Sequence, residues 1–214
     1  MADWVTISSL ATAGGTLVLG VATFASVRSA NRAARVAERS LLAGLRPLLV
    51  PSRLDDPVQK VGFHDNRWFP TRGGCAVAVA EDANIYLTMS LRNVGSGIAV
   101  LHAWRFAPGP GTGADGPPPL EEFHRLTRDL YVPAGDMGFW QGAMRDPADP
   151  EFAALTAAIH AGERLTIDIL YGDHEGGQRT ITRFGMIPYK ADDGTVRWYP
   201  SVALHWNLDR PDPR

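Results

Sequence analysis

Residues 85–106 read IYLTMSLRNVGSGIAVLHAWRF, and this stretch decides the fold. In its first half every second residue is apolar, as in a half-buried strand: Ile85, Leu87, Met89 and Leu91. The second half repeats this period of two at Ile98, Val100, His102, Trp104 and Phe106. Between the halves lies the segment NVGSG, residues 93–97, whose two glycines can adopt positive φ. The stretch therefore predicts a β-hairpin.

A second hairpin is expected near the end of the chain. Leu165 to Tyr171 alternates, residues 172–177 (GDHEGG) form a turn, and Arg179 to Ile187 returns. Further candidate strands are Pro47–Leu54, Cys75–Ala80, Met137–Met144 and Arg197–Trp206. Seven or eight short strands in series favour a mainly β fold, an antiparallel Ig-like β-sandwich.

Two insertions interrupt this pattern. Residues 108–119 (PGPGTGADGPPP) form a Pro/Gly loop that cannot supply a core strand. Residues 149–161 predict one short inserted helix, with Asp149 as N-cap, Pro150 in the first turn and Gly162 as the stop.

The chain begins with an uncharged run from Trp4 to Val27. As a helix rising 1.5 Å per residue, this run is long enough to cross a hydrocarbon layer of about 30 Å. A buried helix of a soluble protein and a cleaved signal peptide are the alternatives. A signal peptide has a basic segment before its apolar run, whereas only Met1, Ala2 and Asp3 come first here. We therefore predict a transmembrane helix at about residues 4–27.

The basic residues follow the apolar run, at Arg28, Arg32, Arg35, Arg39 and Arg46, and only Glu38 opposes them. Because positive flanks stay in the cytoplasm, the N-terminus is expected outside the plasma membrane and the domain inside. The lone Cys75 agrees with a reducing compartment.

Helical character continues as a stalk to about Gly44, which divides the chain into residues 1–44 and a domain of residues 45–214. The residues expected at the membrane surface are Trp4, Arg28, Arg32, Arg35 and Arg39. The basic helix either contacts anionic headgroups or self-associates, or it is a solvated stalk. Ala11 and Gly15 form a pair of small residues through which two membrane helices could approach, so a homo-oligomer is a hypothesis.

Catalytic signatures are missing from the sequence. It has no phosphate-binding loop, no nucleophile elbow, no H-E-x-x-H and no C-x-x-C. The six histidines show no ligand spacing, and Asp173-His174-Glu175 is interpreted as a polar turn. We predict no catalytic, cofactor-binding or metal-ligating residue. The formal net charge of −2 also argues against a nucleic-acid partner.

Exposed aromatic residues near turns would mark a surface for a protein partner. Two such segments occur, Arg67-Trp68-Phe69 and Gly138-Phe139-Trp140. The expected partner patch therefore comprises Trp68, Phe69, Phe139 and Trp140.

The stretch LRNVGSGIA at residues 91–99, the turn YGDHEGG at residues 171–177 and the N-terminal span resemble uncharacterised bacterial single-pass membrane proteins with a C-terminal β-sandwich domain. The resemblance implies the fold and no activity.

Two classes of function fit these observations. The first is a membrane-anchored binding or scaffold protein that presents a cytoplasmic β-sandwich, of which a small subunit of a membrane complex is a variant. The alternative is an enzyme of unfamiliar type at the membrane surface, with Asp168 or Asp173 acting beside a histidine.

Overall fold

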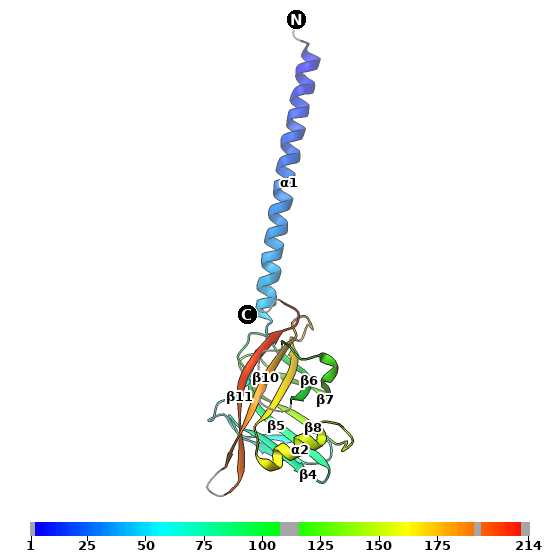
Figure 1. Cartoon of the computed structure of the whole chain (residues 1–214). Helices are drawn as coiled ribbons and strands as arrows, with labels where there is room; N and C mark the ends of the chain where they lie inside the picture. Colours follow the sequence, from blue (N-terminus) through cyan, green and yellow to red (C-terminus); the bar gives the residue numbers. More distant parts are fainter. Residues whose placement is uncertain (1–2, 108–115, 191–193, 211–214) are drawn as a thin grey trace. The chain divides into compact units, whose positions relative to one another are not determined.

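The computed structural model describes residues 3–107, 116–190 and 194–210, so most of the expected Pro/Gly loop lies outside the described residues. The chain divides into two units, Met1–Gly44 and Leu45–Arg214 (Figure 1). The first contains α1 (Trp4–Gly44), a single helix that joins the predicted span and stalk without a break. This helix is long and apolar enough to cross a membrane.

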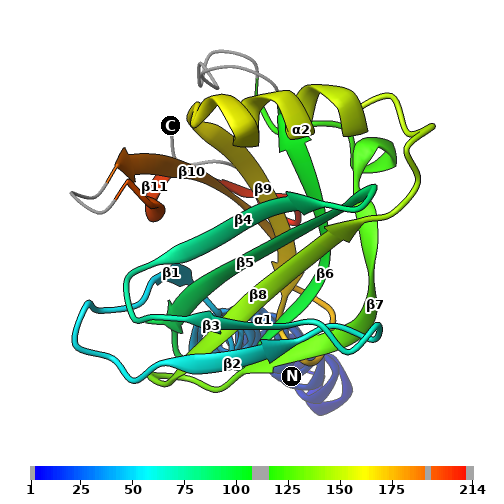
Figure 2. The same ribbon diagram turned by 90° about the horizontal axis from the view of Figure 1, so that it is seen from below.

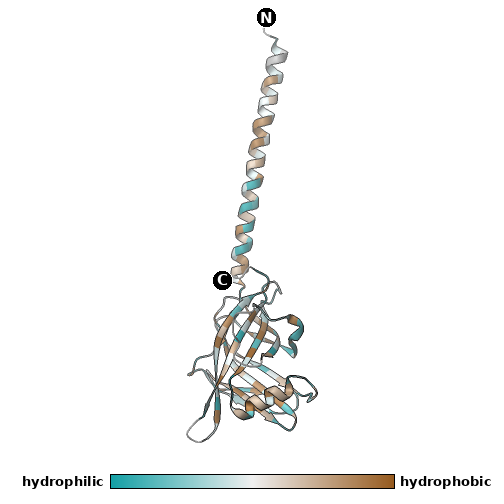
Figure 3. Cartoon of the chain, viewed as in Figure 1, coloured by the Kyte–Doolittle hydropathy of each residue, from teal (hydrophilic) through white to brown (hydrophobic). Residues whose placement is uncertain are grey.

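Figure 3 shows the strongly hydrophilic residues of α1 in the half of the helix nearer Gly44, whereas hydrophobic residues occur in both halves. Three threonine hydroxyls in the apolar part form hydrogen bonds within the helix. The hydroxyls of Thr12, Thr16 and Thr23 each donate to the carbonyl four residues earlier, at 2.8, 2.9 and 2.7 Å. Because these bonds are internal to the helix, the hydroxyls need no water in a hydrocarbon layer.

The second unit folds into two layers of antiparallel strands (Figure 2). The first layer contains β1 (Leu49–Pro51), β4 (Ala76–Glu81), β5 (Asn84–Asn93) and β8 (Met137–Met144). The second contains β6 (Ala99–Ala107), β7 (His124–Val132), β9 (Leu165–Gly172), β10 (Thr180–Lys190) and β11 (Val196–Asn207). One pair of residues, Ala76 and Trp198, joins the layers where β4 meets β11. A separate hairpin is formed by β2 (Gln59–Gly62) and β3 (Trp68–Thr71), and a 3-10 turn spans Leu120–Glu122.

These elements confirm the predicted fold class, a mainly β chain with an N-terminal apolar helix, an antiparallel sandwich-like domain and one short helix. The second predicted hairpin is also confirmed, because β9 pairs with β10. Leu165 lies opposite Met186 at one end of this pairing, and Tyr171 lies opposite Thr180 at the other. The short helix is α2 (Phe152–Ala161), which ends at Gly162 in the left-handed region, φ 61°. It begins after the predicted cap, although the Asp149 carboxylate accepts a 2.9 Å bond from the Glu151 amide.

The first predicted hairpin is wrong in its pairing. Both strands exist, but β5 pairs with β1, β4 and β8, whereas β6 pairs with β7 and β9. The segment 93–97 therefore crosses from one layer to the other. Gly95 and Gly97 are needed because the backbone of residues 45–48 packs directly against them, leaving no space for a Cβ.

Asn93 fixes this crossover and is completely buried. Its side-chain amide donates to the carbonyls of Gly97 and Val132, at 2.6 and 3.0 Å. Its carbonyl oxygen accepts from the amides of Leu48 and Gly95, at 3.1 and 3.0 Å.

The inward face of β6 also differs from the prediction. A register shift between Leu101 and Ala103 places a bulge at His102, so Leu101 and Trp104 both reach the core. Ile98, predicted to face inward, is 39% exposed.

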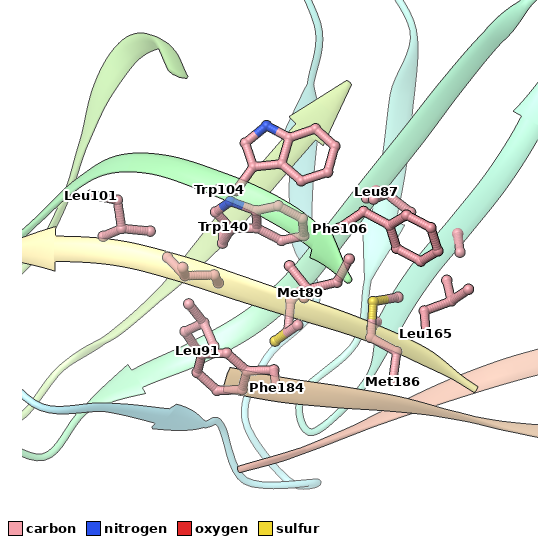
Figure 4. Close-up of a cluster of buried hydrophobic side chains, with 14 of the residues drawn as sticks. Leu87, Met89, Leu91, Leu101, Trp104, Phe106, Trp140, Leu165, Phe184 and Met186 are labelled. Carbon is pink, nitrogen blue, oxygen red and sulfur yellow. The ribbon is translucent and has the colours of Figure 1, made fainter. Parts of the chain in front are cut away.

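The core lies between the layers and contains Leu87, Met89, Leu91, Phe184 and Met186 around two indole rings (Figure 4). The rings of Trp104 and Trp140 meet edge to face, with centroids 5.5 Å apart. Gly142 allows this contact, since a Cβ there would lie 2.7 Å from the Trp140 ring and 2.8 Å from the Trp104 ring.

Candidate functional site

The β2–β3 hairpin packs on the outer face of β5 and β8. Side chains on a strand alternate between its faces, so Val61 and Phe69 point toward the sheet, whereas Lys60 and Trp68 are exposed. Phe63, just beyond β2, is buried beside Phe69 and Tyr86 (ring centroids 5.7 and 5.0 Å away). This aromatic cluster fixes the hairpin on the domain.

A hydrogen bond anchors the turn of the same hairpin. The Tyr86 hydroxyl donates to Asp65 Oδ2 at 2.6 Å, and Arg145 Nη2 lies 3.4 Å from the same oxygen. Burial opposes ionisation of Asp65, but the bonds from Tyr86 and from the Arg67 amide outweigh it and lower the pKa of this carboxyl. Burial raises the pKa of the Tyr86 hydroxyl, with a further contribution from its bond to Asp65. The pair therefore remains a phenol donating to a carboxylate.

The strands β7 and β8 are consecutive and connected by the short link 133–136, in which Gly135 has φ 73°. They lie close near this link, where the Val132 side chain fills the space beside Gly138. Further along they separate, because β7 pairs with β6 in one layer and β8 with β5 in the other. Residues 126–129 of β7 have no partner in β6, since the register shift falls there.

A cleft of about 360 Å³ lies where the two strands separate. One wall is formed by Arg125, Leu126, Thr127 and Arg128 of β7, and the opposite wall by Phe139, Gln141, Gly142 and Ala143 of β8. The hairpin supplies the third wall through Lys60, Gly62 and Trp68, and Trp104 also lines the cleft. The Trp68 ring lies against Gly62, where a Cβ would come within 2.7 Å of it. A volume of this size is within the range of ligand pockets.

The charge of the cleft is positive. It is lined by Lys60, His64, Arg125, Arg128 and Arg145 and by no acidic residue. Asp65 pairs with Arg145, whereas no carboxylate within the described part of the chain forms an ion pair with Lys60, Arg125 or Arg128. Arg128 Nη2 donates instead to Gln141 Oε1 at 3.1 Å and to the Gly62 carbonyl at 3.4 Å, which holds it across the cleft. An anionic group would be attracted here.

Two members of the expected partner patch meet in this cleft. Trp68 is 64% exposed and lines it together with half-buried Phe139, although the two segments are far apart in the sequence. Phe69 packs beneath the hairpin. Trp140 is completely buried in the core, because it points to the opposite face from Phe139, and so it cannot belong to a surface patch.

The residues expected at the membrane surface all lie on α1 with exposed side chains: Trp4, Arg28, Arg32, Arg35 and Arg39. Trp4, at the first residue of the helix, is 83% exposed.

Asp168 and Asp173, the two carboxylates considered for enzyme chemistry, have structural roles. Asp168 is completely buried and accepts bonds from Arg183 at 2.7 and 2.9 Å and from Arg105 at 3.1 Å. Asp173 accepts from the Gly177 amide and the Gln178 side chain, at 2.8 and 3.0 Å, and so organises its turn. Burial raises the pKa of Cys75, which disfavours a reactive thiolate.

The structure assembles one cluster that the sequence spacing does not reveal. His124 Nε2 lies 3.3 Å from Glu151 Oε2, and His124 Nδ1 lies 4.0 Å from Asp149 Oδ2. The three side chains are half-buried and could hold a metal ion. The hydrogen bond between His124 and Glu151 also links β7 to the residue just before α2.

Comparisons of the chain with protein-family models, with curated proteins and with solved structures gave no match.

Proposed function

We propose that the chain is a membrane-anchored binding protein whose partner is anionic and docks in the cleft between β7, β8 and the β2–β3 hairpin. The observation that carries this proposal is the cleft itself, which combines an exposed indole, Trp68, with three cationic side chains that have no carboxylate partner among the described residues. Exposed aromatic and arginine side chains are the types that contribute most to protein recognition.

The helix α1 supplies the anchor. In this proposal its apolar part crosses the plasma membrane with the N-terminus outside, and the four arginines from Arg28 to Arg39 remain at the cytoplasmic surface. Each arginine near an anionic leaflet contributes about 1 kcal/mol to this arrangement. Anchoring raises the local concentration of the domain at the membrane, which favours a partner in the same membrane or complex.

Purification of the full chain from membranes in mild detergent tests the proposal. The informative variant is Lys60→Glu combined with Arg128→Glu, which reverses two charges of the cleft. Its control is Lys190→Glu, an exposed charge at the end of β10 that does not line the cleft. Wild type and control should recover the same protein partner, and the cleft variant about tenfold less. Equal recovery by all three chains, or recovery of no partner by wild type, contradicts the proposal.

A further inference from the structure

The residues that line the cleft show that it lies along strand edges. Successive residues of a strand point to opposite faces, so a cavity on one face meets every second residue. This cleft meets consecutive residues on both sides, 125–128 of β7 and 141–143 of β8. The edges of the two strands therefore form its opposite walls.

The edge of β8 that faces away from β5 is free. β8 pairs only with β5 and β7 only with β6, within the ranges that the structure describes. A free strand edge presents unpaired backbone N–H and C=O groups, which an extended segment of another chain can pair with. The separation of β7 from β8 opens the position that such a strand would take.

The charged and aromatic residues of the cleft indicate which kind of peptide strand could bind there. The cations Lys60, Arg125 and Arg128 surround this edge, and the lining contains no acidic residue. Trp68 and Phe139 add apolar surface beside them. A basic peptide would be repelled, whereas an acidic peptide with an apolar side chain fits both features.

We propose that the cleft binds an extended acidic segment of a partner protein, which adds as a strand to the free edge of β8. This inference rests on the proposed binding function and specifies the partner's chemistry and its mode of binding.

Selection from a displayed library of random octapeptides on the detergent-solubilised full chain tests it first. The enriched peptides should be acidic with at least one apolar residue. Binding of a synthetic peptide, followed by fluorescence anisotropy, should weaken about tenfold or more in Lys60→Glu and in Arg128→Glu, and remain unchanged in Lys190→Glu. Tryptophan fluorescence identical to wild type confirms that each variant is folded.

Backbone methylation of the selected peptide tests strand addition itself. Alternate residues of an added strand direct their N–H groups to the neighbouring edge. N-methylation of one alternating set should therefore weaken binding at least tenfold, and the other set should have little effect. Equal effects of the two sets overturn strand addition, and selection of basic peptides, or of none, overturns the acidic segment.

The two proposals can fail separately. If a partner co-purifies through the cleft but neither peptide test succeeds, the binding function stands and strand addition is wrong. If the cleft charges affect neither co-purification nor peptide binding, both proposals fail.

Discussion

Replacing Asn93 by alanine should destabilise the domain strongly, because it removes the side chain that fixes the crossover between the layers. Asn93 is completely buried and makes four side-chain hydrogen bonds. Each contributes about 1 kcal/mol net, so Asn93→Ala should cost about 4 kcal/mol. This is a large part of the 5–15 kcal/mol that typically stabilises a domain.

Urea unfolding of the full chain in detergent, followed by tryptophan fluorescence, measures this loss. With a slope of about 2 kcal/mol per molar urea, the midpoint should fall by about 2 M. Asn84→Ala is the control, because Asn84 makes one exposed bond, to the Asp82 carbonyl at 3.1 Å, and should change stability by less than about 0.5 kcal/mol. A midpoint for Asn93→Ala within error of the control would refute this account of the crossover.

Three further predictions concern other parts of the chain. Asp168→Asn removes the negative charge that pairs with buried Arg183, so the free energy of unfolding should fall by about 3–5 kcal/mol in the same titration. A loss below about 1 kcal/mol would contradict a structural role for Asp168. Hydrogen bonds from Arg179 lower the pKa of Asp209 below its usual 3.8, so this pair stabilises the domain above that pH and the contribution disappears as the pH falls through the lowered value. The drop in urea midpoint from neutral to strongly acidic pH should therefore be smaller in Arg179→Gln than in wild type, and an equal drop would argue against the pair. In a chain whose native cysteine is replaced by serine, an impermeant maleimide applied to intact cells should label Asp3→Cys and not Tyr131→Cys, and the reverse pattern would overturn the proposed orientation.

The sequence predicts strands well and their partners poorly. Period-two alternation of apolar residues identifies β5 and β9 within a few residues, and the candidate strands 137–144 and 179–187 coincide closely with β8 and β10. β5 and β9 are nevertheless buried on both faces, which the polar residues of the alternation do not reveal. Pairing depends on what the connecting segment contacts. The segment 93–97 has the composition of a hairpin loop, but its glycines serve a close approach to residues 45–48 that no local pattern reveals.

The sequence analysis also did not predict the strands β2, β3 and β7. β7 has the sequence HRLTRDLYV and is mostly exposed in its first part, so it lacks a clear apolar period. The hairpin of β2 and β3 consists of two four-residue strands, too short for a reliable alternation. These three strands make two of the three walls of the cleft. The sequence consequently identified the aromatic residues Trp68 and Phe139 but neither the cleft that joins them nor its cations.

Photocrosslinking in native membranes can show whether the anchored domain binds its partner at the cleft. A photoreactive amino acid would replace Trp68 in one chain and Tyr189, an aromatic residue of similar exposure outside the cleft, in another. If the partner docks in the cleft, position 68 should give a specific protein adduct that disappears when Lys60→Glu and Arg128→Glu are added, and position 189 should give no such adduct. The same adducts from both positions, or none from position 68, would contradict docking in the cleft.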